Sequence, residues 1–193
     1  MKVGLFFGSF NPVHIGHLLV ATRMREAVNL DEIWFVLSPQ NPFKLNAELA
    51  DEQQRLEMLN LSINDIDYFK VCTLEFELDK PSYTHITLKT LKKQYPEIEF
   101  KLIIGEDNVN KFQEWKEAKW ISDNIEILVY SRNTRLTDEN GNKEKYSMKK
   151  INCGYMDISS TEIRQRIKEN KLIDFYVEEK VKQYIMFHKL YQS

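Results

Sequence analysis

The stretch Gly4–His17, with the sequence GLFFGSFNPVHIGH, decides the fold of this chain. It begins as an apolar strand, makes a tight turn of glycine, asparagine and proline, and continues as a helix that carries two histidines near its start. Gly8 removes a side chain where the backbone must come close to a ligand. The amides that follow it can point at phosphate oxygens, as the amides of helix N-termini do.

The rest of the chain continues the alternation of strand and helix. Short β-branched or aromatic runs predict strands over Lys2–Gly8, Glu32–Ser38, Phe69–Leu78, Glu99–Gly105 and Ile125–Ser131. Apolar residues at three- and four-residue spacing predict helices over Ile15–Val28, Asp51–Ile63, Thr84–Gln94 and Val177–Leu190. We therefore expect one α/β domain over residues 1–193, with a Rossmann-like, doubly wound, mainly parallel sheet and helices on both faces. The polar stretch Asn133–Lys150 is expected to form an exposed hairpin or a mobile loop.

Composition excludes several classes of protein. With 193 residues, 42% of them hydrophobic and 29% charged, the chain is typical of one globular domain. A formal net charge of −2 argues against a nucleic-acid partner. The longest apolar runs are too short for a membrane span and no signal peptide is evident, so we expect a cytoplasmic protein without a membrane partner. Cys72 and Cys153 lack metal-ligand spacing, and whether the chain forms a homo-oligomer stays open.

Two histidines at the start of the first helix are candidates for anion binding. His14 and His17 lie three residues apart, so both can donate hydrogen bonds to one phosphate from the same side of the helix. They can also be capping or surface residues. We favour the functional interpretation because they follow a glycine turn at the end of the first strand.

The segment of residues 8–17, GSFxPxHxGH, resembles the signature of the nucleotidyltransferase superfamily, whose HxGH element is shared with class I aminoacyl-tRNA synthetases. Members of this superfamily join a nucleoside triphosphate to a phosphorylated partner and release pyrophosphate, without a covalent enzyme intermediate. The resemblance implies that His14 and His17 are catalytic. It also implies that ATP is bound by Gly8, Ser9, Phe10 and Gly16.

A second signature lies at residues 157–164, DISSTEIR. Ser159 and Glu162 fit a capping box, and a helix start rich in hydroxyls and amides suits the phosphates of ATP. The segment resembles the ISSTxIR signature of the nicotinate and nicotinamide mononucleotide adenylyltransferases at every fixed position. The resemblance implies that Arg164 is a catalytic clamp on the triphosphate and that a helical segment at about residues 159–190 completes the ATP site. The further ATP-binding residues that it implies are Ile158, Ser159, Ser160 and Thr161.

Three segments resemble the pyridine-mononucleotide side of the same family: SYT at residues 82–84, IIGxD at residues 103–107, and Trp115. Trp115 offers a flat face for stacking on a pyridinium ring, although core packing is the alternative. Tyr83 and Thr84 can pair with the carboxylate or amide of the ring. Gly105 and Asp107 are assigned to the ATP side, where the acid can accept hydrogen bonds from ribose hydroxyls.

Some positions depart from the family pattern or have weaker signals. The segment PQNPFK at residues 39–44 resembles a loop that usually ends Pro-His-Lys, so a histidine donor is lost, while Lys44 can still bind a substrate phosphate. Asn11 stands where many relatives have aspartate. Ser131 and Arg132 are candidates for contact with adenine or ribose, with a surface arginine as the alternative. His85 and His188 receive no role in the chemistry.

The resemblance as a whole favours a nicotinate mononucleotide adenylyltransferase of the bacterial type, with ATP and a pyridine mononucleotide as its partners. Such an enzyme forms deamido-NAD and pyrophosphate in NAD biosynthesis. We expect Mg²⁺ to be carried mainly by the phosphates of ATP, because no cluster of carboxylates predicts a separate metal site. The alternatives are a superfamily member that acts on nicotinamide mononucleotide, phosphopantetheine or riboflavin phosphate (FMN) or that uses CTP, and a nucleotide sensor without turnover.

Overall fold

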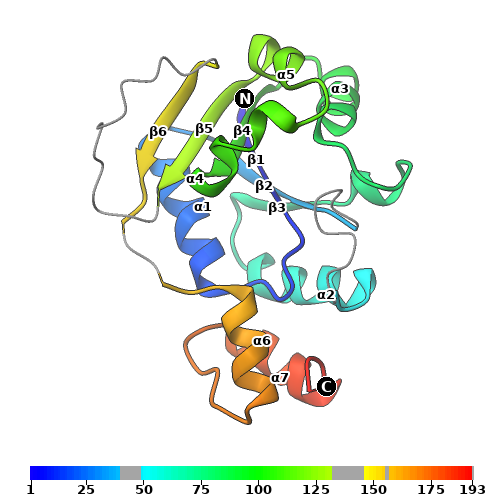
Figure 1. Ribbon diagram of the computed structural model, residues 1–193, viewed down its shortest axis with the longest axis vertical. Coiled ribbons are helices and arrows are strands. Elements are labelled where there is room, and N and C mark those ends of the chain that lie inside the picture. The colour runs from blue at the N-terminus through cyan, green and yellow to red at the C-terminus, as the bar shows by residue number, and fades with distance from the viewer. Residues whose placement is uncertain (40–48, 132–145, 155–156, 193) are drawn as a thin grey trace.

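A parallel sheet organises the molecule. The computed structural model describes residues 1–39, 49–131, 146–154 and 157–192. Within these residues the sheet has six strands, all parallel, in the order β3-β2-β1-β4-β5-β6 (Figure 1). Their bounds are β1 Lys2–Gly8, β2 Glu32–Leu37, β3 Phe69–Cys72, β4 Glu99–Gly105, β5 Glu126–Ser131 and β6 Met148–Asn152. The expected doubly wound α/β fold is confirmed.

Helices cover both faces of the sheet and enclose two hydrophobic cores. The helices are α1 Ile15–Ala27, α2 Glu52–Ile63, α3 Thr84–Gln94, α4 Glu106–Val109, α5 Ala118–Asn124, α6 Ser160–Lys168 and α7 Glu179–Phe187, and the short 3-10 helices are η2 Leu74–Phe76 and η3 Phe112–Glu114. One core joins α1, α2, α6 and α7 to one face of the sheet, and the other joins α3 and α5 to the opposite face. Successive side chains of β1 serve different cores: Leu5 enters the second and Phe6 the first.

The sheet changes winding direction between its two central strands. β1 pairs with β4 from Lys2↔Glu99 to Phe6↔Ile103, although nearly a hundred residues separate them in sequence. The helix that follows β1 packs on one face, while the helices that flank β4 in sequence pack on the other. Parallel sheets of this kind leave a crevice at the carboxyl ends of such a strand pair. Gly8 and Gly105 are the last residues of the two strands.

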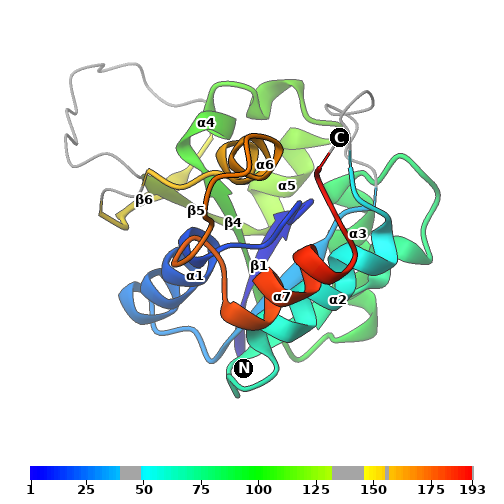
Figure 2. The same cartoon turned by 90° about the horizontal axis from the view of Figure 1, so that it is seen from below.

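The helices α6 and α7 lie beyond the carboxyl edge of the sheet (Figures 1 and 2). Two hydrogen bonds attach this C-terminal segment to the chain that follows β1. The Ser160 hydroxyl donates to the carbonyl oxygen of Pro12 at 2.9 Å, and the amide of Ile15, the first residue of α1, donates to the carbonyl oxygen of Tyr176 at 2.9 Å. Figure 2 also shows α7 running beside α2. The C-terminal segment therefore forms one wall of the region that the central strands open.

Two expectations about secondary structure were wrong in part. The strand expected over Phe69–Leu78 ends at Cys72, because the chain turns there into η2 and buries Glu75. The stretch expected to be a polar loop to Lys150 already contains the start of β6, an edge strand in which only Ile151 is buried. Most of that stretch, residues 133–145, lies outside the described residues. The strands Lys2–Gly8 and Glu99–Gly105 and the helix Thr84–Gln94 have their expected bounds.

No helix among the described residues is both long and apolar enough to cross a bilayer.

Candidate active site

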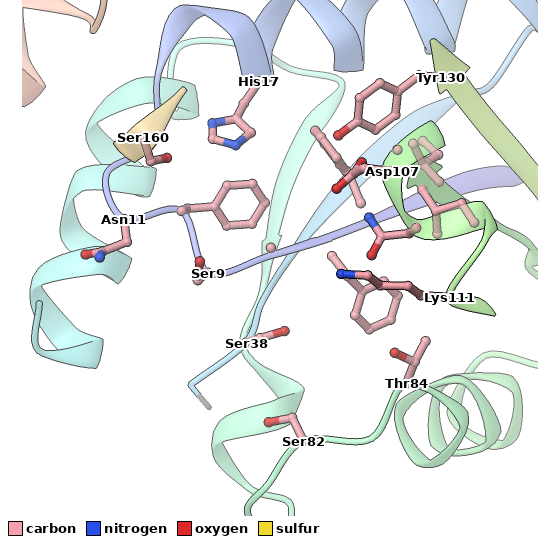
Figure 3. A pocket seen from close by; sticks show the side chains of 18 of the residues that line it. Ser9, Asn11, His17, Ser38, Ser82, Thr84, Asp107, Lys111, Tyr130 and Ser160 are labelled. Atoms are coloured by element: carbon pink, nitrogen blue, oxygen red, sulfur yellow. The ribbon is translucent and has the colours of Figure 1, made fainter. Parts of the chain in front are cut away.

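A pocket of about 1220 Å³ opens at the carboxyl ends of β1 and β4. Its wall combines the turn after β1, the start of α3, the segment from α4 to residue 116, and the start of α6 (Figure 3). The pocket therefore joins segments that lie more than 140 residues apart in sequence. The hydrogen bond from the Ser160 hydroxyl to the carbonyl oxygen of Pro12, for example, spans 148 positions.

The two histidines of the first helix stand side by side in this pocket. The ring centroids of His14 and His17 are 3.6 Å apart and the rings are stacked at an interplanar angle of 28°. Nδ1 of His17 accepts from the backbone N–H of His14 at 3.2 Å, so in the neutral imidazole of His17 the proton resides on Nε2. Gly16 does not line the pocket, but a Cβ there would come within 3.0 Å of Nδ1 of His14. The glycine therefore makes room for the stacked pair.

Arg164 faces the histidines from α6 and also holds the turn after β1. One Nη1 hydrogen bond runs to the carbonyl oxygen of Asn11 at 2.8 Å, and Nη2 donates to the Thr161 hydroxyl at 3.4 Å. Ser159 is the N-cap of α6, since its hydroxyl accepts from the Glu162 amide at 3.1 Å, which is one of the two hydrogen bonds of the expected capping box. Arg164 and the first residues of α6 line the same pocket as the two histidines.

The opposite end of the pocket is aromatic. Tyr83 is the N-cap of α3 and Thr84 its first residue, so the helix begins at the pocket wall. Nζ of Lys116 lies 4.3 Å from the centroid of the Tyr83 ring. Trp115 is half-buried against Phe112, with ring centroids 5.3 Å apart, and also lines the pocket. Trp115 thus packs beside the second hydrophobic core and also borders the pocket.

A glycine at the end of β4 allows α4 to fold back into the site. A Cβ at Gly105 would collide with Oδ1 of Asp107 and lie 3.0 Å from the hydroxyl of Tyr130. A side chain at this position would therefore force Asp107 to move. Ser131 lies behind the wall, where its hydroxyl donates to Oε2 of Glu106 at 2.7 Å.

Most of the predicted residues line the one pocket: His14, His17, Arg164, Gly8, Ser9, Phe10, Gly105, Asp107, Ser159, Ser160, Thr161, Tyr83, Thr84 and Trp115. Three do not, because Gly16 and Ser131 support lining residues and Ile158 packs against the first hydrophobic core. Lys44 and Arg132 lie outside the described residues.

Several lining residues were not assigned a role from the sequence. They include Ser38, Ser82, His85, Lys111, Lys116 and Tyr130. Ser38 follows β2 at the same sheet edge, so its position at a strand end is a signal that could have identified it. His85 was left out of the chemistry, yet its buried Nδ1 has no hydrogen-bond partner among the described residues, and burial lowers its pKa. His188, at the end of α7, is exposed.

A buried acid lies next to the pocket wall. Glu75 is 1% exposed, and its Oε1 accepts from the Thr87 hydroxyl at 2.8 Å. Burial raises the pKa of Glu75, and the hydroxyls of Thr87, Ser38 and Ser82 only partly oppose this rise. Ser38 and Ser82 line the pocket, so a carboxyl group whose pKa is raised by burial stands behind two pocket hydroxyls.

Comparison with known proteins identifies a family whose sequences this chain resembles. The family model described as cytidylyltransferase-like matches residues 5–166. A curated protein of Flavobacterium johnsoniae named probable nicotinate-nucleotide adenylyltransferase is 44% identical, with 100% of both chains covered. A protein of the same name from Bacteroides thetaiotaomicron is 41% identical over 96% of this chain and 91% of its own.

Solved structures show the same fold. A Plasmodium falciparum nicotinic acid mononucleotide adenylyltransferase complexed with NaAD superimposes with a TM-score of 0.81, at 22% identity, over 98% of this chain and 97% of its own.

Proposed function

We infer that this chain, which belongs to the cytidylyltransferase-like family and within it to the nicotinate-nucleotide adenylyltransferases, carries out its reaction in the pocket at the carboxyl ends of β1 and β4. The enzyme transfers the adenylyl group of ATP to nicotinate mononucleotide, which yields deamido-NAD and pyrophosphate in NAD biosynthesis.

One observation carries the assignment of the site. His14 and His17, Arg164 and the start of α6 line a single pocket whose other end holds Trp115. A polyphosphate can lie between donors from α1 and from α6, while an aromatic ring meets the tryptophan. This supports a site that binds two nucleotides at once, with the phosphates in the middle.

The proposed chemistry needs no protein nucleophile. A 5′-phosphate oxygen of the mononucleotide attacks the α-phosphorus of ATP in line, and the bond from that phosphorus to the oxygen bridging the β-phosphate breaks. Pyrophosphate leaves with the electron pair. Catalysis therefore depends on alignment and on donors that stabilise charge on the phosphoryl oxygens. Nε2–H of His17 and the ring of His14 supply such donors at the α-phosphate.

The remaining residues divide between the two substrates. Arg164 and the hydroxyls and amides at the start of α6 hold the triphosphate and the departing pyrophosphate. Asp107 accepts hydrogen bonds from ribose hydroxyls. Tyr83, Thr84 and Trp115 bind the pyridine mononucleotide. Lys44 and Arg132 are proposed as phosphate and adenosine contacts on their sequence positions alone.

Magnesium is proposed to enter on the phosphates of ATP, where it neutralises their charge. Among the residues that the structure describes, no group of three or more His, Cys, Asp or Glu side chains could hold a metal. A cation bound mainly by phosphate oxygens and water needs no such group, and the carboxylate of Asp107 in the pocket is an oxygen ligand of the kind that Mg²⁺ accepts.

The experiment is an assay of the purified chain with Mg-ATP and, in separate reactions, nicotinate mononucleotide, nicotinamide mononucleotide, phosphopantetheine and riboflavin phosphate. We expect dinucleotide and pyrophosphate in equal amounts with nicotinate mononucleotide. A reaction without acceptor corrects for hydrolysis of ATP. Preference for another acceptor would reassign the substrate, and binding without product would make the chain a nucleotide sensor.

A further inference from the structure

We propose that Arg55, Asn11 and Tyr191 form a brace behind the turn after β1, and that this brace holds the turn in the shape that binds the triphosphate. The three residues act as positioning residues, since none of them is proposed to contact a reacting atom. The inference rests on the proposed function of the pocket, because it assigns a purpose to the shape of one of its walls.

Arg55, on α2, is the centre of the brace. It is 1% exposed and donates to four carbonyl oxygens: Nη1 to Ser9 and to Ser38 at 2.9 Å each, Nη2 to Pro39 at 3.0 Å, and Nε to Ala50 at 3.0 Å. These oxygens belong to the turn after β1, the turn after β2 and the residue that precedes the cap of α2. One planar guanidinium thus fixes three chain segments relative to each other, which a lysine could not do.

The charge of Arg55 has no direct carboxylate partner among the described residues. All four of its acceptors are neutral, and Asp51 and Glu52 act on it only through space. Burial lowers the pKa of Arg55, but an arginine side chain stays protonated in water at neutral pH. A buried positive charge therefore lies directly behind Ser9, a residue that faces the pocket (Figure 3).

Asn11 connects this centre to the C-terminal segment. Its Oδ1 accepts from the Ala50 amide at 3.0 Å and from the Tyr191 hydroxyl at 2.8 Å. Its backbone oxygen accepts from Arg164, the proposed triphosphate clamp, at 2.8 Å. Asn11 is 2% exposed, and in Figure 3 its amide points away from His17. The turn is therefore held on its far side by the brace and at its near side by the clamp.

The brace explains what the asparagine at position 11 does. In two of its hydrogen bonds the side chain uses Oδ1 as an acceptor. A carboxylate can accept the same two hydrogen bonds, whereas alanine can accept neither. Asn11→Asp and Asn11→Ala therefore separate the brace from the mere presence of a small side chain.

The first test compares Tyr191→Phe with Tyr184→Phe. Both substitutions remove one hydroxyl from the C-terminal segment, but that of Tyr184 makes no hydrogen bond among the described residues. Hydrogen–deuterium exchange of the full chain without ligand should show faster exchange of the amides of residues 9–11 and 13 in Tyr191→Phe only. Loss of one such hydrogen bond should lower kcat about two- to tenfold and raise KM for ATP, with KM for the mononucleotide unchanged.

The second test uses Asn11. We expect Asn11→Ala to speed exchange of the turn at least as much as Tyr191→Phe, and Asn11→Asp, which can still accept both hydrogen bonds, to exchange more slowly than Asn11→Ala. Equal exchange and equal kcat in Tyr191→Phe and Tyr184→Phe would overturn the proposal, as would equal exchange in the two Asn11 variants. The exchange measurement needs no substrate, so it tests the brace even if the wild-type chain forms no dinucleotide, which would instead refute the proposed function.

Discussion

At the scale of single residues, the position of His17 specifies what its ring can offer to a phosphate. Its Nδ1 is occupied by the His14 amide, and its ring packs at an edge-to-face angle against Phe10, with centroids 5.1 Å apart. Both contacts hold the ring in place before any substrate arrives. Preorganised donors of this kind are the ones that stabilise a transition state.

We expect His17→Ala to lower kcat for pyrophosphate release by about a hundredfold, the usual loss when one preorganised donor is removed. The midpoint of thermal unfolding should change little, because the ring is only half-buried. The exposed His188 provides the control, and His188→Ala should release pyrophosphate at the wild-type rate. Release by His17→Ala at that same rate would remove His17 from the mechanism.

Trp115 gives a prediction about the other substrate. If its ring stacks on the pyridine ring, Trp115→Ala should raise KM for nicotinate mononucleotide roughly tenfold while KM for ATP stays within about twofold. Trp120, on α5 outside the pocket, is the matched control, with Nζ of Lys89 at 4.8 Å from its ring centroid. Equal changes in both KM values, or equal effects of the two substitutions, would indicate a packing role only.

At the scale of elements, the contact between η2 and α3 makes the stability of the protein depend on pH through Glu75. The folded chain retains the proton of Glu75 to a higher pH than the unfolded chain, because burial raises its pKa. The pKa of Glu75 is about 4 in the unfolded chain and higher in the folded chain. Between these two pKa values the unfolded chain has released the proton and the folded chain still holds it. The contribution of Glu75 to the free energy of unfolding therefore falls as the pH increases through this range.

We expect Glu75→Gln to remove this loss, because glutamine has no proton to release in this range. Urea unfolding followed upward from about pH 4 should show the variant gaining stability relative to the wild type, with the gain becoming constant once the pH exceeds the pKa of Glu75 in the folded chain. Glu77→Gln, an exposed change that also lies beside η2, should follow the wild-type curve. If the difference in stability between Glu75→Gln and the wild type does not change with pH, then Glu75 has the same pKa in the folded and the unfolded chain.

The elements also show where sequence patterns succeed. Strands buried on both faces, such as β1 and β4, are mainly apolar along their length, so their bounds could be predicted to the residue. The edge strand β6 buries one residue of five, and its polar sequence resembles a loop. Cys72 to Phe76 alternates like a strand, but the inward turn that buries Glu75 depends on Thr87 from a distant helix. Contacts of that kind leave no local pattern.

At the scale of the whole molecule, the site lies where two hydrophobic cores and a C-terminal helical unit meet. The two motif segments, each rich in glycine, histidine or hydroxyl residues, could be recognised from sequence and do line one pocket. The brace could not, because Arg55 and Tyr191 are ordinary residues within otherwise regular helical or terminal segments. Their importance arises only from carbonyl and amide groups that folding brings to them.

The fastening of α6 to the turn after β1 has a consequence for the order of folding events. The contact from Arg164 to Asn11 spans 153 positions, and closing so long a stretch of chain costs more entropy than pairing neighbouring strand–helix units. In refolding from urea, the far-ultraviolet circular dichroism of sheet and helices should recover before catalytic competence, which an interrupted assay measures. A population with its sheet assembled but unable to turn over substrate should accumulate briefly; simultaneous recovery of both signals would mean that the C-terminal unit docks as the sheet forms.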